Sequence, residues 1–254
     1  MIAHRGASAV RPENTLAAFA AACEMGAPYI ELDVHMTADA VVVVCHDADL
    51  LRTAGAKIAI AQTALEAVRR ADVGATFSAD GEHYPFRGQG LKVPTLAEVL
   101  AAWPDRRFVV EIKQTAPSLV APLLEVVESL HMTDKVLIAS EHQEPLDELR
   151  ALAPAVPTNF SRFEVARFMQ ALAAGQTDFR PPGQALQVPP SYEGFALVTP
   201  ASVDFAHRLG VEVDVWTVNE VDEMKAMLAL GADGIITDCP DRMFGLLAGR
   251  AERC

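Results

Sequence analysis

The most informative part of the sequence is the stretch IAHRGASAVRPENT (residues 2–15), followed by YIELDVHMT (29–37) and VVVVCHD (41–47). Each segment contains an apolar run typical of a β-strand, and ionisable side chains lie at or near the ends of these runs. Because a strand interior favours apolar side chains, ionisable groups gathered at strand ends need an explanation beyond folding. The groups are two histidines, one arginine and three carboxylates, namely His4, Arg5, Glu13, Glu31, Asp33 and His46.

Outward from this stretch, strand-like runs alternate with segments of helical periodicity about eight times. The first helix is predicted from about Asn14 to Gly26, because apolar residues recur there at i, i+3, i+4 and i+7. Strands alternating with helices indicate parallel βαβ units, and eight such units predict an α/β fold, the closed (β/α)8 TIM barrel. An open doubly wound sheet is the alternative, since the strands near residues 158 and 186 are weak.

Residues 48–92 interrupt this alternation. They lack a clear strand and are long for a loop in a compact barrel. We therefore expect a small insertion after the second strand, packed over the barrel mouth just after His46, on the face where barrel enzymes place their chemistry. The whole chain, residues 1–254, is predicted to form a single TIM-barrel domain with this insertion at about 48–92.

The composition is that of an ordinary globular protein with an acidic balance. The chain has 254 residues and a formal net charge of −13, which argues against binding to nucleic acid or to an anionic membrane. Four scattered cysteines without CxxC spacing predict free thiols in a reducing compartment. The sequence shows neither a run of about 18 apolar residues nor room for a signal peptide before His4, so we expect a cytoplasmic protein without a stable membrane anchor.

Three carboxylates at strand ends predict a metal site. Glu31 and Asp33 are two residues apart on a strand, so both point to the same side, with Cα atoms roughly 6.6 Å apart. Glu111 lies at the end of the next strand, RFVVEIK. Convergent carboxylates form an all-oxygen site for a hard divalent cation, Mg²⁺ or Ca²⁺, with Mn²⁺ as a third choice. The set contains no cysteine, which disfavours a structural zinc site.

Two histidines and two basic side chains are predicted to face the same barrel mouth. His4 and His46 follow the first strand segments, and a histidine pair that titrates near neutrality can act as base and acid in one cycle. Arg5, next to the flexible Gly6, offers a bidentate fork for a phosphate, and Lys113 adds a second cation on the side of Glu111. Trp216 ends the strand VEVDVW, where it could line a ligand pocket or fill the barrel core.

Eight short motifs occur along the chain in a fixed order, and together they make most of the chain resemble the glycerophosphodiester phosphodiesterase family. HRG and PENT are followed by the E-x-D segment at Glu31 and Asp33 and by HD at His46 and Asp47. The later motifs are VPTLAEVL (93–100), EIK (111–113), VWTVN (215–219) and GADGIITDCPD (231–241). Each motif alone is weak evidence for this resemblance, but their order and spacing together are strong evidence.

The resemblance implies a TIM barrel with a role for each candidate residue. Glu31, Asp33 and Glu111 would hold the divalent metal, and His4 and His46 would act as general acid and base. Arg5 and Lys113 would bind the phosphate, and Trp216 would line the glycerol or alcohol side of the site. Glu13 and Asn14 would support the site, and Asn14 would also cap the first helix. Two departures from the family pattern, Asp39-Ala40 and Arg52-Thr53-Ala54, concern loop geometry.

Three hypotheses of function follow. The leading one is hydrolysis of a small-molecule glycerophosphodiester to sn-glycerol 3-phosphate and an alcohol. The second is lysophospholipase D-like cleavage of lysophospholipids, which needs an apolar groove that Phe77, Tyr84 and Phe86 of the insertion could supply, although packing of these aromatics onto the barrel is favoured. The third is a barrel that binds phosphodiesters without turning them over, which a complete set of site residues disfavours. Oligomeric state leaves no signature in the sequence.

Overall fold

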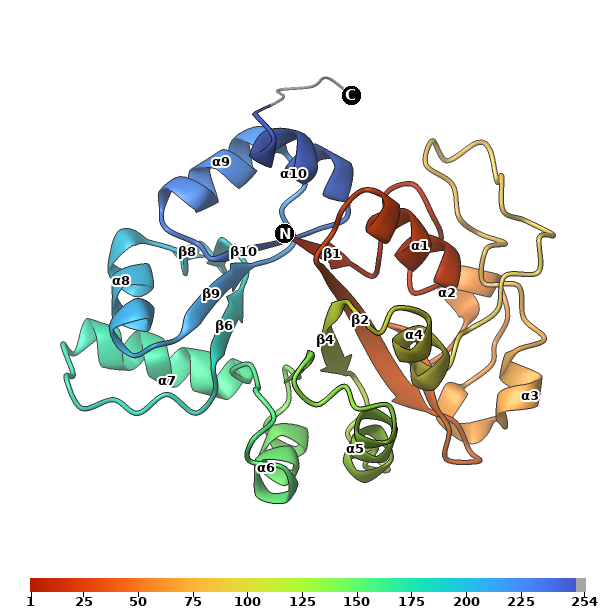
Figure 1. Ribbon diagram of the computed structural model, residues 1–254, viewed down its shortest axis with the longest axis horizontal. Helices are drawn as coiled ribbons and strands as arrows, with labels where there is room; N and C mark the ends of the chain where they lie inside the picture. Colours follow the sequence, from red (N-terminus) through yellow and green to blue (C-terminus); the bar gives the residue numbers. More distant parts are fainter. Residues whose placement is uncertain (250–254) are drawn as a thin grey trace.

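The computed structural model describes residues 1–249, and its centre is a curled parallel sheet (Figure 1). Within these residues, seven strands pair in the order β5–β4–β2–β1–β10–β9–β6. Every neighbouring pair on this path is parallel. The strands are β1 (Ile2–His4), β2 (Tyr29–Met36), β4 (Arg107–Ile112), β5 (Val136–Ala139), β6 (Ala185–Val188), β9 (Glu212–Val215) and β10 (Gly234–Thr237).

Residues 157–160 close this sheet into a barrel. Parallel bridges join Ile138 to Thr158 and Asn159 to Ala185, so this segment lies between β5 and β6 in the eighth strand position. Pro157 has no backbone N–H to donate, which limits the segment to single bridges. The closed TIM barrel is therefore confirmed and the open doubly wound sheet is excluded. Of the two weak strands predicted, the second forms β6 and the first forms only these bridges.

A helix follows each strand position and packs outside the ring of strands (Figure 1). Apolar side chains on both sides of the strand–helix interface form the core, which explains the near-continuous apolar runs of the strands. The helices are α1 (Leu16–Glu24), α4 (Leu96–Ala102), α5 (Val120–Ser129), α6 (Gln143–Leu152), α7 (Arg162–Ala173), α8 (Pro200–Arg208), α9 (Val221–Ala229) and α10 (Pro240–Leu247).

The start of α1 corrects one prediction. Thr15, not Asn14, is the N-cap, because the Thr15 side chain accepts a hydrogen bond from the backbone N–H of Ala18. Asn14 has a positive φ of 55°, and its side chain turns toward the barrel instead. The helix thus begins one residue later than the capping prediction required. The Asn14 side chain does not cap the helix and can contact Asp33 instead.

The connection between β2 and α4 has its own small core. The run VVVVCH forms β3 (Val42–Val44), which pairs antiparallel with the end of β2 and is not a barrel strand. Three short helical turns follow, α2 (Leu51–Ala54), the 3-10 turn η1 (Ile60–Gln62) and α3 (Leu65–Val68). Their buried residues cluster with those of β3, namely Val43, Cys45, Leu50, Ile60, Val68, Val73 and Val93.

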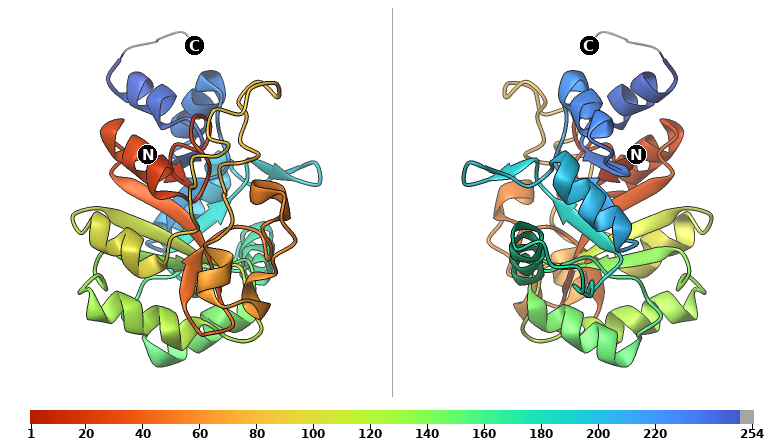
Figure 2. Two further views of the ribbon diagram at one scale, coloured as in Figure 1. Left: turned by 90° about the vertical axis from the view of Figure 1, so that its right-hand side faces the viewer. Right: turned by 90° about the vertical axis from the view of Figure 1, so that its left-hand side faces the viewer.

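A β-hairpin between β6 and α8 was not predicted from the sequence. It consists of β7 (Ser191–Tyr192) and β8 (Phe195–Ala196), and it projects from the body of the barrel (Figure 2). Tyr192 and Phe195 are 56% and 75% exposed, which is unusual for large apolar side chains. The hairpin therefore presents aromatic rings to the outside.

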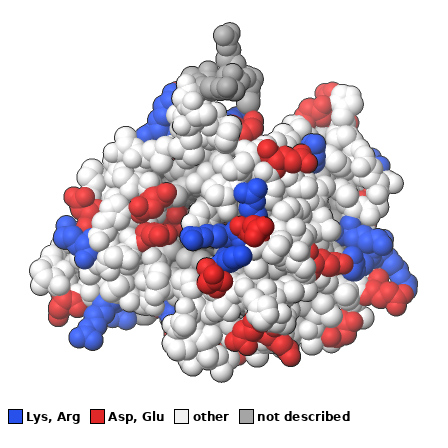
Figure 3. Space-filling model, viewed as in Figure 1, with Lys and Arg blue, Asp and Glu red and all other residues white. Residues whose placement is uncertain are grey.

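The face in Figure 3 carries acidic and basic side chains intermingled, without a broad patch of one sign. None of the helices formed by residues 1–249 combines the length and apolar character needed to cross a membrane. Cys23 and Cys45 are free thiols, as predicted, whereas Cys254 lies outside the described residues.

Candidate active site

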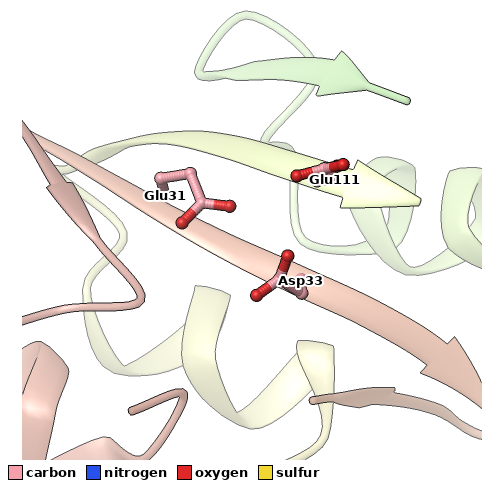
Figure 4. Close-up of side chains that lie close together, drawn as sticks. All are labelled: Glu31, Asp33 and Glu111. Carbon is pink, nitrogen blue, oxygen red and sulfur yellow. The ribbon is translucent and has the colours of Figure 1, made fainter. Parts of the chain in front are cut away.

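Three neighbouring strands bring the predicted site residues to one end of the barrel. In the parallel register, His4 of β1 lies opposite Glu31 of β2, and Asp33 of β2 lies opposite Glu111 of β4. Lys113 directly follows β4. Because parallel strands present their carboxyl ends at the same edge, side chains from distant parts of the chain converge there. Figure 4 shows the carboxylates of Glu31, Asp33 and Glu111 turned toward a common space.

The three carboxylates fit a divalent cation. One oxygen from each of Glu31, Asp33 and Glu111 lies within 4.8 Å of the others. Glu31 Oε1 and Asp33 Oδ1 are buried, and neither accepts a hydrogen bond from any residue that the structure describes, although the Lys113 ammonium lies 3.3 Å from Asp33 Oδ1. Leaving buried carboxylate oxygens without hydrogen bonds is costly, and a hard cation with oxygen ligands would satisfy both.

Burial and mutual repulsion separate the pKa values of these carboxyls. Burial, reinforced by the charge of Asp33, raises the pKa of Glu31. Burial likewise raises the pKa of Glu111. Burial opposes ionisation of Asp33 too, but Lys113 and Arg5 outweigh it and hold the Asp33 pKa below its usual value. The site therefore holds one firmly ionised carboxylate between two that bind protons more tightly.

Two basic side chains partly neutralise the carboxylates. The Arg5 guanidinium Nε is 3.1 Å from Asp33 Oδ2. The backbone N–H of Arg5 donates to Glu31 Oε2 at 2.9 Å. Lys113 Nζ is 2.7 Å from Glu111 Oε1 and 3.3 Å from Asp33 Oδ1. The chain can turn after Arg5 because the next residue is Gly6. A Cβ at position 6 would come within 2.6 Å of the Ala18 backbone.

Each candidate histidine is paired with an aspartate through Nδ1. His4 Nδ1 is 2.7 Å from Asp238 Oδ1, and His46 Nδ1 is 2.7 Å from Asp47 Oδ1. Each aspartate thus orients a ring and leaves Nε2 as the remaining nitrogen. Burial disfavours the charged form of His4, but its contacts with Asp238 and Glu31 prevail and raise its pKa. Asp238, although partly buried, has a pKa lowered to about 2 by its hydrogen bond with His4.

Asp238 is itself fixed by two further side chains. Ser8 Oγ donates to Asp238 Oδ1 at 2.7 Å, and Asn219 Nδ2 donates to Asp238 Oδ2 at 2.7 Å. The Ser8 hydroxyl also lies 2.7 Å from the backbone oxygen of His4. Because both carboxylate oxygens accept hydrogen bonds, the carboxylate beside His4 has a fixed orientation.

Arg52, from the connection after β3, links the two carboxylates that contact the basic site residues Arg5 and His46. Its guanidinium donates to both oxygens of Glu13, at 2.6 and 2.7 Å, and to Asp47 Oδ2 at 2.7 Å. Glu13 also accepts from Arg5 at 3.1 Å, and Asp47 contacts His46. Arg52 therefore helps to fix the positions of Arg5, through Glu13, and of His46, through Asp47.

We expect Arg52→Lys to lower kcat/KM by about 10- to 100-fold, the range found when a group that orients a catalytic residue is lost. Lysine cannot donate to Glu13 and Asp47 in the same planar geometry. Because the Arg52 side chain is 49% exposed, stability should change little. Steady-state kinetics and thermal unfolding would measure both effects. The matched control is Arg70→Lys, whose exposed side chain pairs with Glu66 of α3. Equal losses in both variants would contradict the orienting role.

The remaining predicted residues lie around these groups. Asn14 Nδ2 donates to Asp33 Oδ2 at 2.8 Å, and the backbone N–H of Asp33 donates to Asn14 Oδ1 at 3.3 Å. Trp216, at the end of β9, is half-buried. A cavity of about 880 Å³ is lined by most of the predicted residues, namely His4, Arg5, Glu31, His46, Glu111, Lys113 and Trp216. Asp33 and Glu13 do not line the cavity but contact Arg5, which does, and Asn14 contacts Asp33.

Asp238, Asn219, Ser8, Asp47 and Arg52 were not predicted as site residues. Asp238 directly follows the apolar strand GIIT, and this position at a strand end is the same signal that identified Glu111. Asp47 adjoins His46 in the sequence. Arg52 begins the segment Arg52-Thr53-Ala54, which was interpreted only as loop geometry, because its partners Glu13 and Asp47 meet it only in the folded chain.

Comparison with known proteins agrees with this arrangement. The model of the glycerophosphoryl diester phosphodiesterase family matches residues 4–242. A probable glycerophosphodiester phosphodiesterase 2 of Mycobacterium tuberculosis is 32% identical, and the match covers 99% of this chain and 91% of the relative. A glycerophosphodiester phosphodiesterase of Caldanaerobacter subterraneus is 31% identical, with 97% of each chain covered.

Solved structures show the same likeness. A phosphodiesterase of Oleispira antarctica, in complex with the product sn-glycerol-3-phosphate, superposes with a TM-score of 0.79 at 25% identity, covering 97% of this chain and 96% of that one. A putative glycerophosphoryl diester phosphodiesterase of Silicibacter pomeroyi gives a TM-score of 0.78 at 29% identity, covering 99% and 94%. The chain therefore belongs to the glycerophosphoryl diester phosphodiesterase family, a family of phosphodiester hydrolases.

Proposed function

We propose that this protein hydrolyses small-molecule glycerophosphodiesters to sn-glycerol 3-phosphate and an alcohol. The observation that carries the proposal is one cavity lined by both histidines, Arg5, Lys113 and two of the three clustered carboxylates, Glu31 and Glu111. The family supports the reaction class, and the product bound to the Oleispira antarctica neighbour supports the substrate class. We place the reaction in the cytoplasm, within a single barrel domain whose insertion at about 48–92 covers part of the mouth.

Glu31, Asp33 and Glu111 would hold a divalent cation, Mg²⁺ or Ca²⁺. When bound, this cation supplies positive charge that offsets the charge of the phosphodiester oxygens and lowers the pKa of a coordinated hydroxyl. The buried oxygens of Glu31 and Asp33 that lack hydrogen bonds support this assignment. An all-oxygen donor set matches Mg²⁺ and Ca²⁺, whereas zinc sites favour nitrogen and sulfur.

His4 and His46 would move the protons. With Nδ1 directed at an aspartate, the Nε2 atom of each ring is the one able to exchange a proton with substrate. One ring accepts the proton of the nucleophile, which is water or the 2-hydroxyl of the substrate's own glycerol. The other ring donates a proton to the departing alkoxide. Attack by the 2-hydroxyl would form a cyclic phosphate first, which water then opens.

Arg5 and Lys113 would bind the phosphate, and Trp216 would contact the glycerol or alcohol side. Both cations line the cavity and contact carboxylates that a metal ion would share. A phosphate between them would gain charge-assisted hydrogen bonds from each. The Trp216 ring offers apolar surface to the carbon atoms of the substrate at the same cavity.

The test is release of glycerol 3-phosphate from glycerophosphocholine and glycerophosphoethanolamine by the EDTA-treated protein, with and without added Mg²⁺ or Ca²⁺. We expect release that depends on the added metal. Release that is unaffected by EDTA would contradict the metal assignment. Phosphodiester binding without release under any condition would overturn the proposal in favour of a non-catalytic barrel.

A further inference from the structure

Two buried amide side chains line the cavity without a role in the reaction proposed above. Asn159, in the segment that closes the barrel, is 6% exposed, and Gln187 of β6 is 8% exposed. Val109, Ala139 and Ile236 line the same cavity from the barrel interior, and these residues are buried and apolar. Buried amides are costly unless their polar atoms form hydrogen bonds. The partners of Asn159 and Gln187 therefore show what each amide can bind.

Each amide is held at one end by a fixed partner. Asn159 Oδ1 accepts a hydrogen bond from the backbone N–H of Ser140 at 2.9 Å. Gln187 Nε2 donates to Asp214 Oδ2 at 3.0 Å. Because a backbone N–H can only donate and an ionised carboxylate can only accept, these contacts fix which end of each amide is oxygen and which is nitrogen.

Asp214, which holds Gln187, is a buried carboxylate of the barrel interior. Gln187 and Asp214 are paired residues in the parallel register of β6 and β9, so their side chains point to the same side of the sheet. Trp216 follows Asp214 by two residues and lines the same cavity as Gln187. Burial raises the pKa of Asp214 to about 6, although the hydrogen bond from Gln187 opposes this rise. At pH 8 the group is therefore an ionised acceptor for the amide nitrogen of Gln187.

The free ends of the two amides are one donor and one acceptor. Within residues 1–249, neither Asn159 Nδ2 nor Gln187 Oε1 forms a hydrogen bond. The two residues lie in neighbouring strand positions, because Asn159 bridges to Ala185, two residues before Gln187. A hydroxyl group accepts one hydrogen bond and donates another, whereas an ionised phosphodiester only accepts and a choline group does neither. Of these groups of the substrate, a hydroxyl matches both amide ends.

We infer that Asn159 and Gln187 form a hydroxyl-binding subsite that takes the terminal hydroxyl of the substrate's glycerol group. The inference rests on the proposed function and specifies which part of the substrate the protein recognises. The 2-hydroxyl lies closer to phosphorus, so it belongs with the histidines and the cation. The terminal hydroxyl is one carbon further from phosphorus and can reach β6, beside Trp216. Asn159 donates to this hydroxyl, and Gln187 accepts from it.

Asp214 is a positioning residue of this subsite, because it acts through Gln187. Its carboxylate only accepts, so it keeps Nε2 of Gln187 on its own side and leaves Oε1 for the hydroxyl. An amide in place of this carboxylate could donate as well as accept. The Gln187 side chain could then turn over and present a donor where the hydroxyl needs an acceptor.

The first experiment compares choline release from glycerophosphocholine and from its 1-deoxy analogue, 2-hydroxypropyl phosphocholine of the same configuration, with Mg²⁺ or Ca²⁺. The analogue keeps the 2-hydroxyl and lacks the terminal one. We expect kcat/KM to be about 10- to 100-fold lower for the analogue, mainly through a higher KM, because both amide ends then lose a partner. Equal kcat/KM values would overturn the inference, since the amides would then hold water only, and would leave the proposed function intact. Absence of choline from both substrates would overturn the proposed function and the inference with it.

The second experiment removes the acceptor. Gln187→Met keeps the length of the side chain, and we expect it to reduce the preference for glycerophosphocholine over the analogue at least about fivefold. Cleavage of the analogue at the rate of the unmodified protein shows that the variant is folded. The matched control is Gln170→Met, at an exposed glutamine of α7 that also lines the cavity, and its preference should equal that of the unmodified protein. A Gln187→Met variant with an unchanged preference would contradict the subsite.

The third experiment, Asp214→Asn, tests the positioning role without changing a residue that contacts the substrate. The two side chains have nearly the same shape, and the change removes a buried charge, so we expect the fold to be kept. The preference for glycerophosphocholine should fall about two- to fivefold, with kcat/KM for the analogue unchanged, because the Gln187 amide can turn over. An unchanged preference, or an equal loss of activity on both substrates, would contradict the positioning role.

Discussion

Replacing either His4 or His46 with alanine is expected to lower kcat/KM for glycerophosphocholine by about 10²- to 10⁴-fold, the usual contribution of a positioned general acid or base. Both rings line the cavity, and both are oriented by an aspartate through Nδ1. Removal of one ring leaves either the nucleophile without a base or the leaving alkoxide without an acid. Steady-state kinetics with the metal at saturation would measure the loss.

The pH profile separates this chemistry from a structural effect. The unmodified protein should show a bell-shaped dependence of kcat/KM on pH, and each variant should lose one limb of it. His83→Ala is the matched control, because His83 also contacts an aspartate through Nδ1, at 2.6 Å from Asp80, but lies on the surface. Turnover that stays unchanged in both His4→Ala and His46→Ala would contradict the assignment of the pair.

The barrel could be predicted because its strands are regular in sequence. Parallel strands buried on both faces are apolar along their length, so runs such as RFVVEI and GIIT stand out between amphipathic helices. The segment 157–160 could not be assigned with the same certainty. It makes single bridges to β5 and β6 and contains a proline, so tertiary closure of the barrel, not local propensity, holds it in place.

The carboxylate cluster could be predicted for the same geometric reason. The two-residue period of a strand places Glu31 and Asp33 on one side, and the parallel register places Glu111 beside Asp33. Asp238 and His4 are 234 residues apart in the sequence. They lie in contact because β1 pairs with β10. Only the closed barrel creates that contact. Residue type and position at a strand end can mark both His4 and Asp238 as candidates, but only the folded barrel shows that Asp238 orients His4.

The β7–β8 hairpin, whose Tyr192 and Phe195 line the cavity, could not be predicted from the sequence. The strands of the β7–β8 hairpin have two residues each, too short for an alternating pattern. Tyr192 and Phe195 are separated by a tight turn and face solvent, where aromatic residues carry no periodic signal. The insertion offered more aromatic residues, and the prediction therefore considered a groove there.

Glu31→Gln is expected to have opposite effects on activity and on stability. Loss of one carboxylate from the cluster should lower metal-dependent turnover by about 100-fold or more, because the cation contributes several kcal/mol to the stability of the transition state. The same change removes a buried negative charge beside Asp33. In the metal-free protein it should therefore raise Tm at pH 8 by about 2–4 °C, the shift that about 1 kcal/mol gives in a domain of this size.

The pH dependence of the stability gain follows from the direction of the pKa shift. Because the folded-state pKa of Glu31 is raised above its ordinary value of 4.5, the stability that this group contributes is present below that value. It is lost as pH rises through the folded-state pKa. Glutamine mimics the protonated form at every pH, so the Tm difference between variant and unmodified protein should grow from pH 6 to pH 8.

Metal addition provides the decisive comparison. Mg²⁺ or Ca²⁺ should raise the Tm of the unmodified protein, because a ligand that binds only the folded state stabilises it by mass action. The same addition should have little effect on Glu31→Gln. Glu66→Gln, at a side chain that is 86% exposed, should respond like the unmodified protein. A Glu31→Gln variant that is less stable than the unmodified protein at pH 8 and still gains Tm from metal would show that the cation is held elsewhere.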